Sequence, residues 1–269
     1  MIAEIGGRRF EWGARTYVMG IVNVTPDSFS GDGLGQDYDA AVALGLRMVS
    51  DGADMLDVGG ESTRPGHVPV SAAEEISRTE AVVRRLARES SVPVSLDTYK
   101  QEVAEVGVAV GATILNDVWG LTRTPALAEL AGRHGCGLVV MHNQDGAEYA
   151  GDLMDEIKGF LGAAAARAIA AGVPKEKVIV DPGIGFGKTA DQNWEVLRRF
   201  SELQELGHPI LVGTSRKSFI GKLLDLPVTE RLEGTTATVV AAVLRGADIV
   251  RVHDVKEMVR AVRVADHIR

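Results

Sequence analysis

Short runs rich in β-branched residues alternate with longer amphipathic stretches along the whole chain of 269 residues, and this alternation restricts the fold more than any other feature. It is typical of parallel βα units, because a parallel strand needs a helical crossover before the next strand can pair with it. We expect strands at 17–22, 55–58, 94–97, 113–116, 137–142, 178–181, 210–213 and 249–252.

The stretches between these strands have the spacing of helices. We expect helices at 39–50, 72–88, 125–134, 153–171, 192–206 and 236–245. In the second of them, Glu75, Arg78 and Arg85 are predicted to form the solvated face. Eight βα units in a chain of this length predict a single-domain α/β fold, the (β/α)8 TIM barrel, with residues 1–16 as a short N-terminal extension. A doubly wound open sheet is the alternative.

Composition limits the partners. The net charge is -8, whereas a protein that binds nucleic acid is expected to carry a basic face. No stretch approaches the roughly 18 continuous apolar residues of a membrane helix, and the N-terminus lacks the apolar segment of a signal peptide. The single Cys136 cannot form an internal disulfide and is expected to be a small buried residue. We therefore expect a cytoplasmic protein that binds neither nucleic acid nor membranes.

Polar residues follow the end of every expected strand. They are Asn23, Asp57 with Glu61, Asp97, Asn116 with Asp117, His142, Asp181, Ser215 to Lys217, and Arg251 with His253. A single one of them is as readily explained as a helix cap. Because the carboxyl ends of all strands in a barrel meet at one rim, the whole set together predicts a binding site there.

The rim residues divide by chemistry. Two carboxylates, an amide and a cationic donor suit a planar heterocycle with several N–H groups and a carbonyl, and these groups belong to Asp97, Asn116, Asp181 and Lys217. Arg251 and His253 follow the last strand, and barrels often bind phosphate in the last two loops. We therefore expect an anionic group beside the heterocycle.

The segment VDPGIGFGKT at 180–189 has the appearance of a nucleotide-binding loop. The phosphate-binding motif fails, because Pro182 stands where its first glycine is required and has no N–H to donate. The dinucleotide fingerprint fails as well, because Lys188 occupies the position of its third glycine. Asp181 is therefore the expected functional residue, and the glycines are expected to let the loop pass close to a ligand.

The loops at 23–33 and 59–66 are longer than most βα links, so we expect them to act as lids. Asn23, Asp27 and Asp32 offer oxygen ligands of the kind that Mg²⁺ prefers. Alternatively, each is a turn residue that bonds its own backbone.

Seven segments of the chain resemble dihydropteroate synthases of folate biosynthesis, in order and in spacing. They are MGIVNVTPDSFS, DVGGESTRPG, SLDTYK, ILNDVWG, DPGIGFGK, GTSRKS and RVHDVKE, and the resemblance runs from about Val18 to the C-terminus. It implies a transferase that joins 6-hydroxymethyl-7,8-dihydropterin diphosphate to p-aminobenzoate, giving 7,8-dihydropteroate and diphosphate. It also implies a Mg²⁺ cofactor, a homodimer and sensitivity to sulfonamides.

The resemblance implies roles for individual residues. The catalytic residues would be Asp97, Asp181, Lys217 and Arg251. The pterin contacts would be Asp97, Asn116, Met141, Asp181, Phe186, Gly213, Lys217 and Arg251. The diphosphate contacts would be Asn23, Thr63, Arg64, Arg251 and His253, with the metal on Asn23. The p-aminobenzoate contacts would be Phe29, Thr63, Pro65, Phe186, Lys217 and Ser218, with Lys188 nearby and with Asp27 and Asp32 as loop carboxylates. Asp32 follows Gly31, one position later than in many members.

The expected mechanism is a dissociative substitution. The aromatic amine is a neutral nucleophile, so no strong base is required. Mg²⁺, Arg251 and His253 would stabilise the leaving diphosphate. Two other functions are open: a pterin-dependent methyltransferase, which would not need the loop at 23–33, and a pterin-binding paralogue without turnover. The presence of both Arg251 and His253 favours the synthase.

Overall fold

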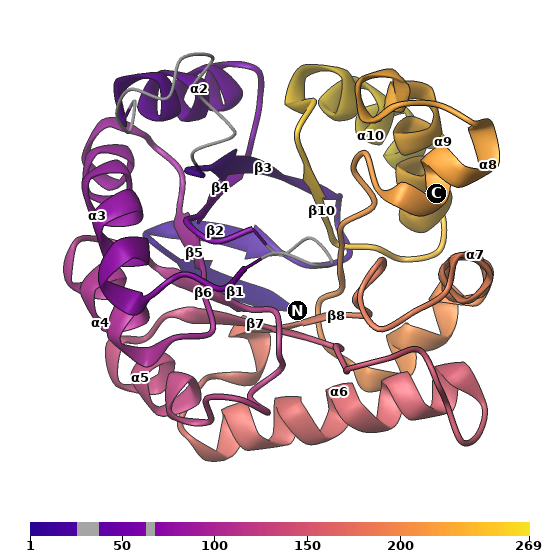
Figure 1. The fold of residues 1–269 in the computed structure, drawn as a ribbon, viewed down its shortest axis with the longest axis horizontal. Coiled ribbons are helices and arrows are strands. Elements are labelled where there is room, and N and C mark those ends of the chain that lie inside the picture. Colours follow the sequence, from indigo (N-terminus) through magenta and orange to yellow (C-terminus); the bar gives the residue numbers. More distant parts are fainter. Residues whose placement is uncertain (26–37, 63–67) are drawn as a thin grey trace.

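Eight parallel strands form the centre of the molecule, in the order β8-β7-β6-β5-β4-β3-β10-β9 (Figure 1). The computed structural model describes residues 1–25, 38–62 and 68–269. The strands are β3 (Tyr17–Asn23), β4 (Met55–Gly59), β5 (Val94–Asp97), β6 (Ile114–Asp117), β7 (Gly137–Met141), β8 (Val178–Asp181), β9 (Leu211–Val212) and β10 (Ile249–Val252). A parallel bridge between Val180 and Ile210 joins the two edge strands. The predicted barrel is therefore confirmed, and the open sheet is wrong.

Helices surround the barrel (Figure 1). They are α2 (Tyr38–Ser50), α3 (Ala72–Glu89), α4 (Gln101–Ala109), α5 (Ala126–His134), α6 (Leu153–Ala170), α7 (Ala190–Arg198), α8 (Ser218–Leu224), α9 (Leu232–Val243) and α10 (Val255–Ile268), with 3₁₀ turns η1 (Lys175–Lys177), η2 (Phe200–Leu206) and η3 (Val228–Glu230). The single helix predicted at 192–206 is wrong. It divides into α7 and η2, where Phe200 and Leu203 are both fully buried at the three-residue spacing of a 3₁₀ turn.

The N-terminal extension folds under the barrel. It forms an antiparallel hairpin of β1 (Ile2–Ile5) and β2 (Arg8–Glu11). Phe10 stacks on Trp12 at 5.3 Å between ring centroids, and Tyr17 meets both rings edge-on. These rings belong to one core cluster with the interior strand residues Met19, Met55, Ile114, Val139, Ile179, Leu211 and Ile249. The hairpin therefore closes the amino-terminal end of the barrel.

The prediction that Glu75 and Arg78 are solvated is wrong, because they are 1% and 7% exposed. The face of α3 that carries them packs against the end of β4, where Arg78 Nη1 donates to the Gly60 carbonyl at 2.7 Å. Lys100 Nζ lies 2.5 Å from Glu75 Oε2. Arg85 is half-exposed, as predicted. The buried charges of α3 thus fix the backbone that begins the second long loop.

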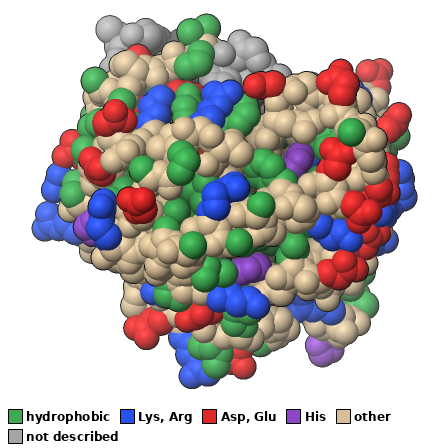
Figure 2. Space-filling model, turned by 90° about the horizontal axis from the view of Figure 1, so that it is seen from below, with side chains coloured by type: hydrophobic (Ala, Val, Ile, Leu, Met, Phe, Trp, Pro, Cys, Tyr) green, Lys and Arg blue, Asp and Glu red, His purple; other side chains and the backbone are tan. Residues whose placement is uncertain are grey.

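The surface carries charges of both signs. On the face in Figure 2, Lys and Arg side chains are separated by apolar and acidic side chains rather than gathered into a continuous basic stripe. Among the described residues, no helix combines the length and the apolar character needed to cross a bilayer. Cys136 is buried, as predicted.

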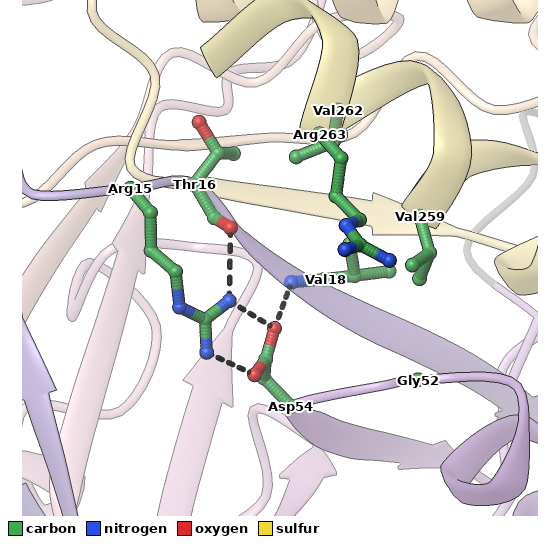
Figure 3. Close-up of a pocket in the computed structure, with 8 residues that line it drawn as sticks. All are labelled: Arg15, Thr16, Val18, Gly52, Asp54, Val259, Val262 and Arg263. Atoms are coloured by element: carbon green, nitrogen blue, oxygen red, sulfur yellow. Dashed lines mark hydrogen bonds and ion pairs between the residues drawn. The ribbon is translucent and has the colours of Figure 1, made fainter. Parts of the chain in front are cut away.

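A cavity of about 260 Å³ lies at the amino-terminal end of β3, away from the strand ends that carry the rim residues (Figure 3). It is lined by Arg15, Thr16, Val18, Gly52, Asp54, Val259, Val262 and Arg263. Asp54 accepts from Val18 N at 2.9 Å and from both terminal nitrogens of Arg15, at 3.0 and 2.5 Å. Residues on this face of a barrel generally serve stability.

Asp54→Ala is therefore expected to destabilise the protein without slowing its reaction. The substitution leaves the buried Val18 N–H without its acceptor, at a cost of about 1–3 kcal/mol. Urea unfolding would measure the loss, and turnover of the folded variant should equal that of the wild type. A folded variant with much lower kcat would contradict a purely structural role for this cluster.

Candidate functional site

Interior side chains change from apolar to polar toward the carboxyl ends of the strands. Because side chains alternate along a strand, every second residue faces the barrel interior. The resulting interior layer consists of Asn23, Asp57, Gly59, Ser95, Asp97, Asn116, Met141, Asp181, Gly213 and Arg251. Asp117 faces outward instead, where its carboxylate accepts from Trp119 N and Leu121 N. The rim residues predicted from the sequence thus belong to two different faces, and only the interior ones converge.

Arg251 lies between two carboxylates of this layer. Its Nε donates to Asp57 Oδ2 at 2.6 Å, and its Nη2 donates to Asp97 Oδ2 at 2.8 Å. Asn116 Nδ2 donates to the same Asp57 oxygen at 3.0 Å. Burial acts to lower the pKa of Arg251, but the charges of Asp57 and Asp97 outweigh it and raise that pKa. Arg251 is therefore held as a cation inside the barrel.

Asp97 and Asp181 are poorly solvated carboxylates. Burial raises the pKa of Asp97 to about 8, against the opposing charge of Arg251. Burial also raises the pKa of Asp181, against the opposing charge of Lys217. A buried carboxylate without enough donors is a strong acceptor for the N–H groups of a ligand. The carboxylate oxygens of Asp97 on β5 and of Asp181 on β8 are thus available as hydrogen-bond acceptors in the interior layer.

The segment after β8 orients Asp181. Gly183 N donates to Asp181 Oδ1 at 2.7 Å. Gly183 has a φ of +68°, and a Cβ there would lie 1.9 Å from the His142 carbonyl oxygen, so no other residue fits. Lys217 Nζ donates to the Ile184 carbonyl and lies 4.5 Å from the centroid of the Phe186 ring. The glycine-rich loop therefore passes close to the interior layer, as predicted.

Lys217 is partly buried beside the acidic layer. Burial lowers its pKa to about 8, although the charge of Asp181 opposes this shift. Ser218, the next residue, begins α8 and is exposed. The charges of Asp181, Arg251 and Asp97 all act on Lys217, so its ammonium can serve as a cationic donor at the interior layer.

Lys188 points into its own loop. Its Nζ lies 2.9 Å from His142 Nδ1 and donates to the carbonyls of Gly183 and Phe186 at 3.1 and 3.0 Å. Burial lowers the pKa of Lys188 to about 7. These contacts hold the loop in shape; they indicate a structural role for Lys188, which the sequence did not predict.

His142 is expected to make the folded state sensitive to acid. Burial, followed by the charge of Lys188, lowers its pKa from the ordinary 6.5 to about 3. Since the unfolded chain takes up this proton below pH 6.5, stability falls by about 1.4 kcal/mol per pH unit on its account as the pH drops toward 3. His142→Gln keeps an acceptor for Lys188 and should flatten this slope in urea unfolding between pH 6.5 and 3. Equal slopes for wild type and variant would contradict the assignment.

The side of the rim after β9 and β10 holds His253 in one orientation. Ser215 Oγ lies 2.9 Å from His253 Nδ1 and accepts from His253 N at 3.1 Å. Arg216 is paired instead with Asp254, through Nε at 2.9 Å and Nη2 at 2.5 Å. His253 and Arg251 are thus directed from β10 toward the rim, whereas Arg216 is engaged elsewhere.

Several predicted site residues lie outside the described residues. They are Asp27, Phe29, Asp32, Thr63, Arg64 and Pro65. The sequence placed Asp57 among the rim residues but gave it no individual role, although it follows the interior residue Met55 by two positions. Counting alternate positions along β4 would have placed its side chain inside the barrel.

Comparison with known proteins adds four findings. The model of the family described as pterin binding enzyme matches residues 19–253. The dihydropteroate synthase of Clostridium beijerinckii is 48% identical over 266 residues, which cover 98% of each chain. The structure of Clostridium difficile dihydropteroate synthase in the presence of pteroic acid aligns with a TM-score of 0.93 at 50% identity, covering 96% of this chain and 98% of its own. That of the Xanthomonas albilineans enzyme with 4-aminobenzoic acid aligns at 0.93 and 41% identity, covering 99% and 97%.

Proposed function

The chain belongs to the pterin binding enzyme family, and we propose that it catalyses the dihydropteroate synthase reaction of folate biosynthesis. It is a transferase that moves the pterinylmethyl group of 6-hydroxymethyl-7,8-dihydropterin diphosphate onto p-aminobenzoate. The observation that supports this function most strongly is the composition of the polar site at the carboxyl ends of the strands. It combines two poorly solvated carboxylates, an amide and two cations, which belong to Asp97, Asp181, Asn116, Arg251 and Lys217.

The pterin binds through its hydrogen-bonding edge. A pterin offers a guanidine-like set of N–H donors, which match the carboxylates of Asp97 and Asp181, and a carbonyl, which matches the ammonium of Lys217. Asn116 supplies an amide between them. Met141 and Phe186 border the ring, and Gly213 leaves space at the end of β9.

The diphosphate binds on the side of β10 and β3. Arg251 and His253 supply cationic and N–H donors there, and Asn23 ends β3 at the same rim. Thr63 and Arg64 are proposed to contact it from the second long loop.

Mg²⁺ fits this side of the site. No group of three or more His, Cys, Asp or Glu side chains able to hold a metal occurs within 1–25, 38–62 and 68–269. Mg²⁺ does not need one, because it is commonly bound by one or two protein oxygens together with substrate phosphates. Asn23 would supply the amide oxygen, with Asp27 or Asp32 as a second ligand. The ion would neutralise part of the diphosphate charge.

The reaction is a dissociative substitution at the pterin methylene. The bond from carbon to the diphosphate oxygen breaks as Arg251 and His253 stabilise the departing anion. Positive charge that develops on the pterin is shared by the ring, which the carboxylates of Asp97 and Asp181 stabilise. The amine of p-aminobenzoate then forms the new carbon–nitrogen bond and gives up one proton to the departing diphosphate. It would be held in a pocket of Phe29, Thr63, Pro65, Phe186, Lys217 and Ser218.

We also propose that the protein acts in the cytoplasm as a homodimer. Large apolar side chains are exposed on the neighbouring helices α8, α9 and α10 or beside them, including Leu223, Leu224, Leu244, Val264 and Ile268. A second copy would cover them. Sedimentation of a monomer at micromolar concentration would contradict this.

Release of diphosphate tests the proposed function. The purified protein should release it only when the pterin diphosphate, p-aminobenzoate and Mg²⁺ are all present. Omission of any one component should abolish release. Release without p-aminobenzoate would indicate hydrolysis, and tight binding of a pterin without release would indicate a paralogue that does not turn over.

A further inference from the structure

Asp57 is the most deeply placed charge of the interior layer. Its side chain is fully buried, and one of its oxygens, Oδ2, receives two donors, Arg251 Nε and Asn116 Nδ2. Its other oxygen, Oδ1, has no hydrogen-bond partner in the part of the chain that the structure describes. A buried carboxylate with an unused oxygen is costly, so its retention calls for a reason beyond packing.

The two ends of Arg251 are held differently. Nε, close to the aliphatic chain, is bonded to Asp57, whereas the terminal Nη2 is bonded to Asp97. On the proposed function, Asp97 is a pterin acceptor, and Arg251 already occupies one of its two oxygens. A pterin that binds through Asp97 Oδ2 would displace the guanidinium from it.

We propose that Asp57 is a positioning residue that retains Arg251 in the barrel when a pterin displaces it from Asp97. The hydrogen bond between Arg251 Nε and Asp57 is retained, so the terminal nitrogens of Arg251 can turn away from Asp97. The guanidinium then still has the carboxylate of Asp57 as its counter-ion. The same oxygen accepts from Asn116 Nδ2, which leaves the Asn116 carbonyl oxygen available to a ligand donor. One carboxylate thus orders two groups that contact the substrate.

Asp57→Asn tests this proposal, because it preserves the shape of the side chain and removes its charge. Without Asp57, Arg251 has Asp97 as its remaining counter-ion and should resist displacement. We expect the KM for the pterin diphosphate to rise and its kcat/KM to fall roughly tenfold to a hundredfold, as is typical when a reacting group is misplaced. The KM for p-aminobenzoate should stay within about twofold of the wild-type value, because in the described part of the chain Asp57 bonds Arg251 and Asn116, which are not assigned to that pocket.

Asp117→Asn is the matched control, because it makes the same chemical change outside the interior layer. Asp117 is also a fully buried aspartate at the end of a barrel strand, but it faces outward and accepts from Trp119 N and Leu121 N. Its replacement should leave both KM values unchanged. An equal effect of the two substitutions would mean that the loss of any buried aspartate in the barrel disturbs the site, and would overturn the proposal.

A double-mutant cycle separates positioning from stability. In an Arg251→Ala background, Asp57→Asn should cause a clearly smaller loss of pterin affinity than in the wild type, because of the two groups that it positions only Asn116 remains. Losses that multiply in the double variant would overturn the proposal. Calorimetry with 6-hydroxymethylpterin gives the affinities whether or not the protein turns over, so a failure of the proposed function remains distinguishable.

A structure of the wild-type protein with a bound pterin tests the proposal even if the Asp57 variants do not fold. The bond between Arg251 Nε and Asp57 should persist, while that between Arg251 Nη2 and Asp97 should be replaced by a bond to the pterin. Departure of Arg251 from Asp57 on binding would overturn the proposal.

Discussion

Asp181→Ala is expected to lower kcat/KM for the pterin substrate by roughly 10³-fold to 10⁵-fold, the range seen when a site built for hydrogen bonding loses its partner. Asp181 Oδ1 is oriented by Gly183 N, and its charge opposes the shift in the pKa of Lys217. Without it the ligand loses a charged acceptor, and Lys217 loses its largest source of stabilisation as a cation. Steady-state kinetics and pterin calorimetry would measure both effects.

Asp117→Asn is the control for this substitution. Asp117 is also a buried aspartate at a strand end, but it faces outward and accepts from Trp119 N and Leu121 N. Its replacement should reduce stability and leave the kinetics of the folded protein near those of the wild type. Retention of activity by Asp181→Ala, or an equal loss in both variants, would contradict the assignment of the interior layer as the pterin site.

Arg251→Ala is expected to lower kcat by roughly 10³-fold, in line with the removal of one donor to a developing anion. It should also destabilise the protein by about 3–5 kcal/mol, because breaking a buried ion pair leaves its partners uncompensated. Those partners are Asp57 and Asp97.

The loss of stability should depend on pH with a definite sign. The pKa of Asp97 is already about 8 in the folded protein, above its value of 3.8 in an unfolded chain, and removal of Arg251 raises it further. In the wild type, the cost of this raised pKa stops growing once the pH passes about 8, whereas in the variant it goes on growing up to the higher pKa. Urea unfolding should therefore show a larger destabilisation by Arg251→Ala at about pH 9.5 than at about pH 6.

Arg216→Ala is the matched control for Arg251→Ala. Its guanidinium also pairs with an aspartate, Asp254, but its side chain is 38% exposed. An exposed pair of this kind contributes about 0–1 kcal/mol, so the variant should be nearly as stable as the wild type at both pH values. If Arg251→Ala destabilised the protein no more than Arg216→Ala does, the proposed contribution of the buried ion pairs to stability would be contradicted.

The barrel was predictable because strand runs and helical runs differ in period, and eight strand runs separated by helical runs fit one architecture. The positions of Asp97, Asn116 and Asp181 were predictable because each lies at the end of a strand or one residue before it. Strand ends alone did not separate Asp117, which faces outward, from its neighbour Asn116. The distinction requires one residue that is known to face the interior, here Ile114. Because side chains alternate along a strand, Asn116 then faces the interior and Asp117 faces outward.

Other features depend on contacts between distant segments, which local pattern does not contain. Glu75 and Arg78 have the spacing of a polar helix face, yet they are buried because Lys100 and the Gly60 carbonyl supply partners from other strand ends. The strands of the N-terminal hairpin are too short to be predicted from the spacing of apolar residues. The hairpin is stabilised by a long-range contact, because Phe10 packs against the interior residues of the barrel.

The most direct measurement is the formation of 7,8-dihydropteroate, followed by mass spectrometry, in parallel reactions of the wild type, Asp181→Ala and Asp117→Asn with both substrates and Mg²⁺. We predict product from the wild type and from Asp117→Asn, and almost none from Asp181→Ala. Absence of product from a folded wild type that still binds a pterin would contradict the synthase assignment.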